Sequence, residues 1–477
     1  MKISKTFSNR EIPLLKSCTD FNPFRYRIPV ILTSIVFIIA FSFIHLSLST
    51  FISYILFGVI GLYISAYFGR KAIKLFTLVY AISTISAVSF YYIFLIQYKI
   101  PYGGGGSDSL GYENLAALLR NSNLRYNSEE IGLIIDLPYH NSKGYIYLIN
   151  LFIRFGDFFG GFHTMIPRLF NCNLLGISSV IIYSICKKIS LPINQALKSG
   201  LVTGLFPIMI YVSVQSLRDT PIVCILIISV SLSISIIKTK GIPKRILYTL
   251  LFVPLAFILM EFRLLNIINL FLMLIVGWFV YLFSIKRLSN FYIVSIIAGF
   301  VIVYNSLTFI DIPLAINLIS KLDSSSLDLA EGVDRSVEGG LSLILFNLPV
   351  YLKFFASIAY SFITPLPILY TKDFDWNFLA LGTIYQFLFI PFVYFGLKYS
   401  FRSRLMLPIF SMFLISYVGY VFGTFTFRHI TNFVPFAAIY GVIGYENFKY
   451  RRHFIWSISG GFLVLLLLIY YSIKVIF

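Results

Sequence analysis

Residues 141–190 read NSKGYIYLINLFIRFGDFFGGFHTMIPRLFNCNLLGISSVIIYSICKKIS and combine two kinds of helix. An aromatic, amphipathic segment comes first, followed by a Gly-rich turn and by an apolar segment that begins near Arg168 and ends in two lysines. Amphipathic helices lie in the membrane interface, whereas an apolar run of about twenty residues crosses the bilayer. We therefore expect a juxtamembrane helix over 145–160 and a membrane-spanning helix over 165–186.

Apolar runs of similar length recur along the whole chain of 477 residues. Hydrophobic residues make up 58% of it and charged residues 12%, whereas soluble domains carry roughly 25% charged residues. We therefore predict an all-α, polytopic membrane protein with about thirteen transmembrane helices. The spans are expected at 28–48, 51–67, 75–98, 165–186, 198–214, 221–237, 246–261, 264–284, 291–309, 377–396, 406–422, 431–445 and 455–474.

Basic residues cluster in the short breaks between these runs, which accounts for the net charge of +19 without a nucleic-acid partner. Basic breaks alternate with breaks that are poorer in basic residues. By the positive-inside rule, the basic breaks and the N-terminus lie in the cytoplasm and the C-terminus outside, in an integral plasma (inner) membrane protein. The clusters are Arg70, Lys71 and Lys74; Lys187 and Lys188; Lys238, Lys240, Lys244 and Arg245; Lys286 and Arg287; Lys398, Arg402 and Arg404; and Lys449, Arg451 and Arg452.

This topology divides the chain into five segments. The polar residues 321–340 are typical of a flexible loop. The apolar piece 341–370 is expected to lie in the outer interface, or to form a re-entrant pair broken near Pro365 and Pro367. The segments are a cytoplasmic tail with three spans (1–98), an outer loop with juxtamembrane helices (99–164), a six-span core (165–309), a second outer loop (310–376) and a four-span C-terminal segment (377–477).

Several charged residues stand at or just inside the outer ends of the expected spans. Ionisable groups at such positions are costly unless they pair or face a water-filled cavity, so they are functional candidates. The alternative is that they pair with one another and only fix helix ends. The residues are Asp108, Arg168, Arg218, Asp219, Glu261, Arg263 and Arg428.

The first of these acids follows a glycine run, in GGGGSDSLGYENLAALL at 103–119. At helical spacing, Asp108 and Tyr112 share one face. Glu113 stands one position off that face and is interpreted as a solvated neighbour. Asp108 is therefore the candidate to meet a substrate on the outer side.

The order of these features resembles the GT-C superfamily of integral membrane glycosyltransferases, which includes protein mannosyltransferases and aminoarabinose transferases. In that superfamily an acid opens the first large outer loop, often with a Tyr four residues on, as Asp108 and Tyr112 do here. Juxtamembrane helices follow, then a span that begins with Arg-Leu and ends in a basic pair, and then an outer Asp. Arg168 and Asp219 match these positions, and Arg428 matches a late Arg before a Pro-containing span.

The residue types suit glycosyl transfer on their own account. A carboxylate at the outer surface can accept the proton of an attacking hydroxyl, which is the catalytic role expected for Asp108. Arginine binds phosphate through its planar fork of donors, so Arg218, Arg263 and Arg428 are candidates to bind the donor phosphate. Tyr112, Arg168, Asp219 and His429 complete the expected substrate-binding set. A local salt bridge between Arg218 and Asp219, or a helix-end role for His429, is the alternative to a role in the site.

The sequence therefore predicts an inverting enzyme that transfers a sugar or glycan from a polyprenyl (pyro)phosphate carrier to a glycan or lipid acceptor on the outer face. A Wzy-type polymerase of O-antigen or capsule repeat units is one alternative, and a transporter or flippase of the lipid-linked sugar is another. His140 and His163 lack ligand spacing, so no metal site is predicted. No cofactor is assigned, although Asp219 leaves a divalent metal open.

Overall fold

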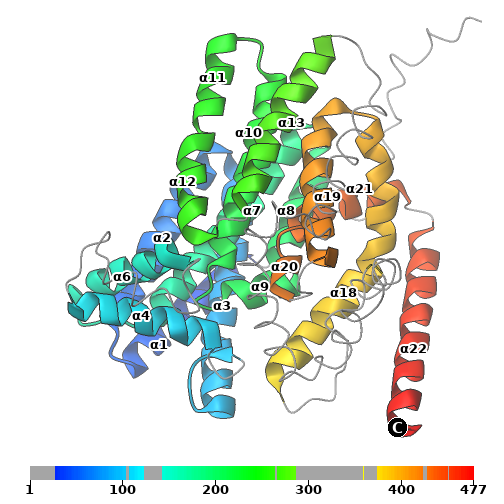
Figure 1. Ribbon diagram of the computed structural model, residues 1–477. Coiled ribbons are helices and arrows are strands. Elements are labelled where there is room, and N and C mark those ends of the chain that lie inside the picture. Colours follow the sequence, from blue (N-terminus) through cyan, green and yellow to red (C-terminus); the bar gives the residue numbers. More distant parts are fainter. Residues whose placement is uncertain are drawn as a thin grey trace, which may run out of the picture.

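In the computed structural model of the protein, the residues described are 27–103, 107–122, 142–263, 266–285, 358, 373–422, 427–448 and 451–476. The regular elements in these ranges are all helical (Figure 1). They are α1 (Arg27–Ile44), α2 (Leu48–Tyr67), α3 (Arg70–Tyr98), α4 (Ser107–Ser122), α6 (Lys143–Asp157), α7 (Met165–Lys188), α8 (Ile193–Leu205), α9 (Pro207–Ser213), α10 (Asp219–Lys238), α11 (Ile242–Leu250), α12 (Phe252–Phe262), α13 (Asn266–Ile285), α18 (Phe374–Leu397), α19 (Leu407–Phe422), α20 (Phe427–Ile430), α21 (Val434–Asn447) and α22 (Arg452–Ile476), with short 3₁₀ turns at Lys398–Phe401 and Arg404–Met406.

Within the described ranges, eight helices are long and apolar enough to cross a membrane, where α11 and α12 count as one span. The all-helical membrane class is therefore confirmed, whereas the count of about thirteen spans is not. The expected span 291–309 and almost all of 310–372 lie outside the described residues. The expected spans 406–422, 431–445 and 455–474 form α19, α21 and α22, which are not among the eight.

The expected span 198–214 is broken into α8 and α9, which meet at an angle of 52° and would make a ninth span if counted together. The break lies at Phe206, whose backbone is extended with ψ of 126°. Proline disfavours the helical conformation of the residue before it and lacks an N–H to donate, so Pro207 ends α8 and starts a new helix. The bend directs the following loop, 214–218, toward the site described below.

Helix α7 forms the centre of the bundle, and 89% of its most apolar window is buried. It packs against α2, α3, α8 and α10. Close packing at the other large contact, between α18 and α21, depends on glycine. A Cβ added to Gly396 would lie 1.9 Å from the carbonyl oxygen of Tyr440, and one added to Gly444 would lie 1.9 Å from that of Phe392. Small residues let helix backbones approach closely inside membrane proteins.

Basic side chains gather at one end of the bundle, which we call the basic end. There Lys188 of α7 bonds to the hydroxyls of Ser231 and Ser235 at 2.8 Å, and Lys238 donates to the Lys188 carbonyl at 3.0 Å. Arg404 donates to the carbonyl of Phe283 near the end of α13 at 3.3 Å. Helices α4 and α6 lie across the opposite end of the bundle (Figure 1). The apolar piece expected at 145–160 is therefore found in α6.

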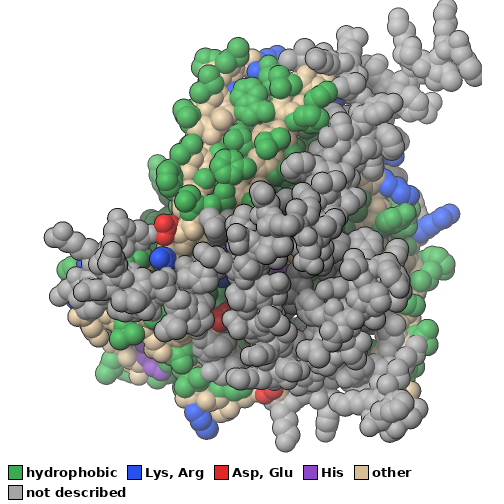
Figure 2. All heavy atoms as spheres, in the orientation of Figure 1, with side chains coloured by type: hydrophobic (Ala, Val, Ile, Leu, Met, Phe, Trp, Pro, Cys, Tyr) green, Lys and Arg blue, Asp and Glu red, His purple; other side chains and the backbone are tan. Residues whose placement is uncertain are grey.

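Hydrophobic side chains cover the outer face of α11, α12 and α13 (Figure 2). Leu247 is 56% exposed, Phe257 65% and Ile275 58%. A contiguous apolar surface of this kind is typical of contact with lipid or another apolar partner. Together with the long apolar helices, it fits a membrane protein.

Candidate functional site

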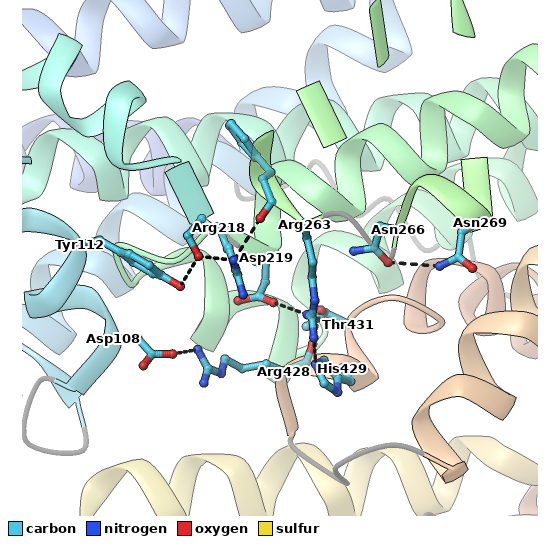
Figure 3. A network of polar contacts seen from close by, with 12 residues as sticks. Asp108, Tyr112, Arg218, Asp219, Arg263, Asn266, Asn269, Arg428, His429 and Thr431 are labelled. Atoms are coloured by element: carbon cyan, nitrogen blue, oxygen red, sulfur yellow. Dashed lines mark hydrogen bonds and ion pairs between the residues drawn. The ribbon is translucent and has the colours of Figure 1, made fainter. Parts of the chain in front are cut away.

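Four helix ends bring charged side chains together at the end opposite the basic end (Figure 3). Asp108 comes from the first turn of α4, whereas Arg218 and Asp219 stand at the start of α10. Arg263 follows α12, and the short helix α20 carries Arg428 and His429. We call these six residues the site cluster. Seven of the eight residues expected in the site therefore lie together, namely these six and Tyr112, which contacts them through Ser142.

Asp108 and Arg428 form an ion pair between Oδ2 and Nη1 across 320 residues of sequence. Each side chain is 30% exposed. Burial tends to lower the pKa of Arg428, but the negative charges of Asp108 and Asp219 outweigh it, so this pKa is raised. Arg428 is therefore a permanent cation at an accessible position.

Arg263 lies deeper and joins two other members of the cluster. It donates from Nη2 to Nε2 of His429 at 2.6 Å, and its Nη1 is 3.8 Å from Oδ1 of Asp219. Burial and the neighbouring Arg218 lower the pKa of Arg263 to about 10, against the opposing effect of Asp219. The pKa of His429 lies well below its usual range because of burial and of Arg263 and Arg428. His429 is therefore neutral and accepts the hydrogen bond.

Arg218 connects the cluster to the helices that lie across this end of the bundle. Its Nη1 donates to Oγ of Ser142 and, at 3.0 Å, to the carbonyl oxygen of Phe262. The Ser142 hydroxyl in turn lies 3.4 Å from that of Tyr112. Arg218 thus holds the end of α12 and the start of α6 together. The ion pair that the structure describes for Asp219 is the one with Arg263, at 3.8 Å.

The cluster carries a net positive charge. Three guanidinium groups face two carboxylates, so three positive minus two negative charges leaves one positive charge among the described residues. Asp219 is the more enclosed of the two acids, since 8% of its side chain is exposed against 30% for Asp108. The cluster suits an anionic ligand that enters on the side of Asp108 and Arg428.

Arg168, the eighth expected residue, lies in a second, buried cluster behind the first. It is 1% exposed, donates to the carbonyl oxygen of Pro101, and lies over the rings of Tyr91 and Tyr102 at 5.7 and 5.5 Å. Such cation–π contacts stabilise a desolvated guanidinium. Arg168 therefore stabilises the packing next to the site cluster. Its burial argues against the direct contact with substrate that the sequence predicts.

Glu113 belongs to this second cluster, and its interpretation as a solvated neighbour is wrong. It is 6% exposed and accepts hydrogen bonds from Tyr102 at 2.7 Å and from Thr164 at 2.8 Å. Burial raises the pKa of Glu113, although the charge of Arg168 opposes this. The signal in the sequence was helical spacing, because Glu113 falls on the stripe with Tyr112, Ala116 and Leu119 that α4 buries.

Asn171 of α7 is a further residue that the sequence reasoning missed. It is fully buried and donates from Nδ2 to the carbonyl oxygens of Gln215 and Leu217, at 2.8 and 2.9 Å. These two bonds fix the loop that ends in Arg218 and Asp219. A buried Asn one turn beyond Arg168 in an apolar span was the only hint in the sequence.

Within the part of the chain that the structure describes, no group of three His, Cys, Asp or Glu residues is arranged to hold a metal ion. The site cluster instead offers guanidinium donors and one accessible carboxylate. The sequence matches no protein-family model, and no curated protein matches it.

Proposed function

We propose that the protein is a membrane glycosyltransferase that transfers a sugar or glycan from a polyprenyl phosphate or pyrophosphate carrier to an acceptor at the outer membrane face. The observation that carries the proposal is the convergence of Arg218, Arg263 and Arg428 at one end of an apolar helix bundle, where Asp108 pairs with Arg428 and Asp219 with Arg263. A lipid-linked sugar donor requires this combination. The donor has an apolar tail, an anionic phosphate and, next to the phosphate, the sugar carbon that reacts.

The arginines supply the phosphate chemistry. Guanidinium groups bind phosphate oxygens through paired, charge-assisted hydrogen bonds. As the glycosidic bond to phosphate breaks, negative charge develops on the leaving oxygen, and fixed cations stabilise that charge in the transition state. All three are partly exposed, and the Arg428 side chain, at 30%, is more exposed than that of Arg263, at 22%.

Asp108 supplies the base. The acceptor hydroxyl must lose its proton as its oxygen attacks the anomeric carbon, and a positioned carboxylate accepts such a proton. Asp108 stands in the first turn of α4, on the same end of the bundle as the three arginines (Figure 3). It is also the more exposed acid of the cluster, so an acceptor can reach it.

The positive-inside rule supports the sidedness of the proposal. Lys188, Lys238 and Arg404 mark the basic end, which the rule places in the cytoplasm. The site cluster then faces the outer or periplasmic side. On that side of the membrane, sugar donors are attached to a lipid carrier. The exposed apolar faces of α11 to α13 provide a surface that the tail of the carrier can contact.

A repeat-unit polymerase is the second candidate, because three arginines also suit the two phosphates of a pyrophosphate carrier. One experiment separates the two reactions. Surface polysaccharide is compared on gels from the wild-type strain, a strain that lacks the gene, and that strain complemented with Asp108→Asn. A ladder that collapses to one repeat identifies a polymerase, whereas an intact ladder that lacks one sugar identifies a decorating transferase.

The same proposal has a biochemical test. Purified protein is expected to consume lipid-linked sugar and to release the lipid phosphate. Turnover of a nucleotide sugar without turnover of any lipid-linked sugar would contradict the proposal. Full activity of Asp108→Asn would remove Asp108 from the role of base.

A further inference from the structure

We infer that Asp108 holds, in the resting protein, the place that the donor phosphate takes on Arg428, so that donor binding itself releases the catalytic base. The binding half of this inference concerns lipid phosphate alone, whereas the catalytic half rests on the proposed function.

Side-chain exposure singles out the ion pair between Asp108 and Arg428 over the pair between Asp219 and Arg263. The Asp108 and Arg428 side chains are each 30% exposed, whereas those of Asp219 and Arg263 are 8% and 22% exposed. Of the two ion pairs, the one between Asp108 and Arg428 is therefore the more accessible to an anion that enters the cluster. Ligand and carboxylate compete for one guanidinium.

Hydrogen-bond geometry favours the exchange. Asp108 contacts Arg428 through one oxygen, Oδ2, and one nitrogen, Nη1. A phosphate group presents several oxygens to the same guanidinium and can accept two parallel bonds from it. The neighbouring Arg263 adds attraction for the phosphate from behind. One bond to Asp108 is exchanged for two to the ligand.

Displacement changes the chemistry of Asp108. It frees Oδ2 of Asp108 from the hydrogen bond with Arg428, so that this oxygen can accept a hydrogen bond from the acceptor hydroxyl. Phosphate and carboxylate are both anions, so they repel and the carboxylate turns away from the phosphate. In-line attack requires the acceptor on the face of the sugar opposite the phosphate, and a carboxylate released from Arg428 is free to bind the acceptor hydroxyl there.

The transfer step then balances. The acceptor oxygen forms a bond to the anomeric carbon while the bond from that carbon to the phosphate oxygen breaks, and the electron pair leaves with the phosphate. The acceptor proton passes to Asp108, which becomes neutral. A neutral Asp108 does not compete for Arg428, so the product phosphate stays bound until Asp108 loses its proton. Its restored charge then competes with the product phosphate for Arg428.

The inference predicts that a variant unable to catalyse binds the lipid phosphate more tightly. Full-length protein in detergent is titrated with a short-chain polyprenyl monophosphate, and the Kd is measured by calorimetry. Asp108→Asn is expected to lower the Kd about three- to tenfold, because the competing charge is gone. Asp108→Glu keeps the charge and is expected to bind no more tightly than wild type. Arg428→Gln is expected to raise the Kd more than tenfold.

The chain offers a control ion pair that also includes a residue of α4. Asp157 of α6 forms an exposed ion pair with Arg120 of α4 at 3.1 Å, with both side chains more than 40% exposed. Asp157→Asn removes the same charge from the same end of the protein and is expected to leave the Kd unchanged. If Asp157→Asn lowered the Kd as much as Asp108→Asn, the effect would come from the net charge of the protein alone, and the inference would be overturned.

Other outcomes are also decisive. An unchanged or higher Kd for Asp108→Asn, in protein that melts at the wild-type temperature, overturns the inference. If Asp108→Asn misfolds, Asp108→Ser replaces it, with the same expectation. Tighter binding together with no turnover of lipid-linked sugar by the wild type would leave the phosphate exchange standing and refute the proposed function.

Discussion

Arg263 donates a hydrogen bond of 2.6 Å to Nε2 of His429 and so joins the end of α12 to α20, 166 residues further along the chain. Burial, together with the charges of Arg263 and Arg428, lowers the pKa of His429 and keeps the imidazole neutral, so that its ring nitrogen can accept this bond. The imidazole therefore positions Arg263 without adding a further charge to the cluster.

Loss of this acceptor is expected to weaken donor binding. His429→Ala frees Arg263 from its position and should raise the KM for lipid-linked donor about five- to tenfold, the effect of one charge-assisted hydrogen bond. His429→Gln, whose amide oxygen can accept the same bond, should restore most of the affinity. Steady-state kinetics with a purified donor check this. A KM for His429→Ala equal to that of wild type would show that Arg263 needs no such support.

Asn171 is expected to affect turnover although it lies outside the site cluster. Asn171→Leu removes both bonds to the carbonyls of Gln215 and Leu217 and frees the loop before Arg218 and Asp219. Misplacement of a catalytic group by about 1 Å can cost on the order of a hundredfold in rate, so we expect kcat to fall at least tenfold. The matched control is Asn173→Leu, a change at a buried position of the same helix that lies beside Gly61 of α2. Equal loss in both variants would indicate damage to α7 as a whole.

The fold could be predicted further than the site. Long apolar runs predicted the helices, because a helix satisfies the backbone N–H and C=O groups of about twenty apolar residues in lipid or in the core. The number of spans could not be derived in the same way. Helix α21 has 14 residues and is only about 21 Å long, and Pro207 breaks the α8–α9 segment. Hydropathy alone does not separate a short or broken buried helix from a complete span.

In the site, the sequence identified which charges stand at helix ends but not which charges meet. The pairing of Asp108 with Arg428 joins positions 320 residues apart, and no local pattern encodes such a contact. Arg218 was weighed as a partner of its neighbour Asp219, yet it bonds to Ser142 and Phe262. Glu113 was expected in solvent because it stands one position off the face of Asp108 and Tyr112, yet that position belongs to the stripe that α4 buries. Long-range packing decides these contacts.

Glu113 is expected to contribute to stability because its carboxylate accepts hydrogen bonds from the hydroxyls of Tyr102 and Thr164. Glu113→Ala leaves Tyr102 and Thr164 without their acceptor in a buried region, which typically costs about 1–3 kcal/mol. The melting temperature in detergent should fall by several degrees. The exposed neighbour Asn114→Ala is the control and should melt like wild type. An unchanged melting temperature for Glu113→Ala would show that water replaces the carboxylate without loss.

His163 is expected to make stability depend on pH. Burial, together with the nearby charges of His45 and Arg168, lowers its pKa to about 4, and its Nδ1 accepts a bond from the Met165 N–H at 3.1 Å. The unfolded chain takes up this proton near pH 6.5 and the folded protein only near pH 4. The unfolded state therefore binds more protons between these values, and stability falls as the pH falls from 6.5 toward 4, by at most about 1.4 kcal/mol per pH unit.

The measurement is the melting temperature between pH 7.5 and 4.5. Wild type should lose stability over this range, and His163→Asn, which keeps an acceptor but does not titrate, should lose less. His453 is exposed at the start of α22, and its replacement by Asn serves as the control. A pH dependence that is the same in wild type and His163→Asn would assign the loss to other groups.

The contact between α18 and α21 is expected to tolerate no side chain at Gly444. A Cβ there would lie 1.9 Å from the carbonyl oxygen of Phe392, and because that atom belongs to the α18 backbone, the helices must separate. Overpacking of this kind costs about 1–3 kcal/mol or more. Gly444→Ala should therefore lower the melting temperature, although alanine has the higher helix propensity.

Gly460 of α22 provides the opposite case, since a Cβ added there meets no atom within 4 Å. Gly460→Ala should leave the melting temperature unchanged or raise it slightly, because only helix propensity acts. The difference between the two variants isolates the clash from the propensity. Helix α21 follows α20, which carries Arg428 and His429, so Gly444→Ala should also weaken binding of lipid phosphate. Wild-type binding in a destabilised Gly444→Ala variant would show that α20 keeps its place independently of the contact between α18 and α21.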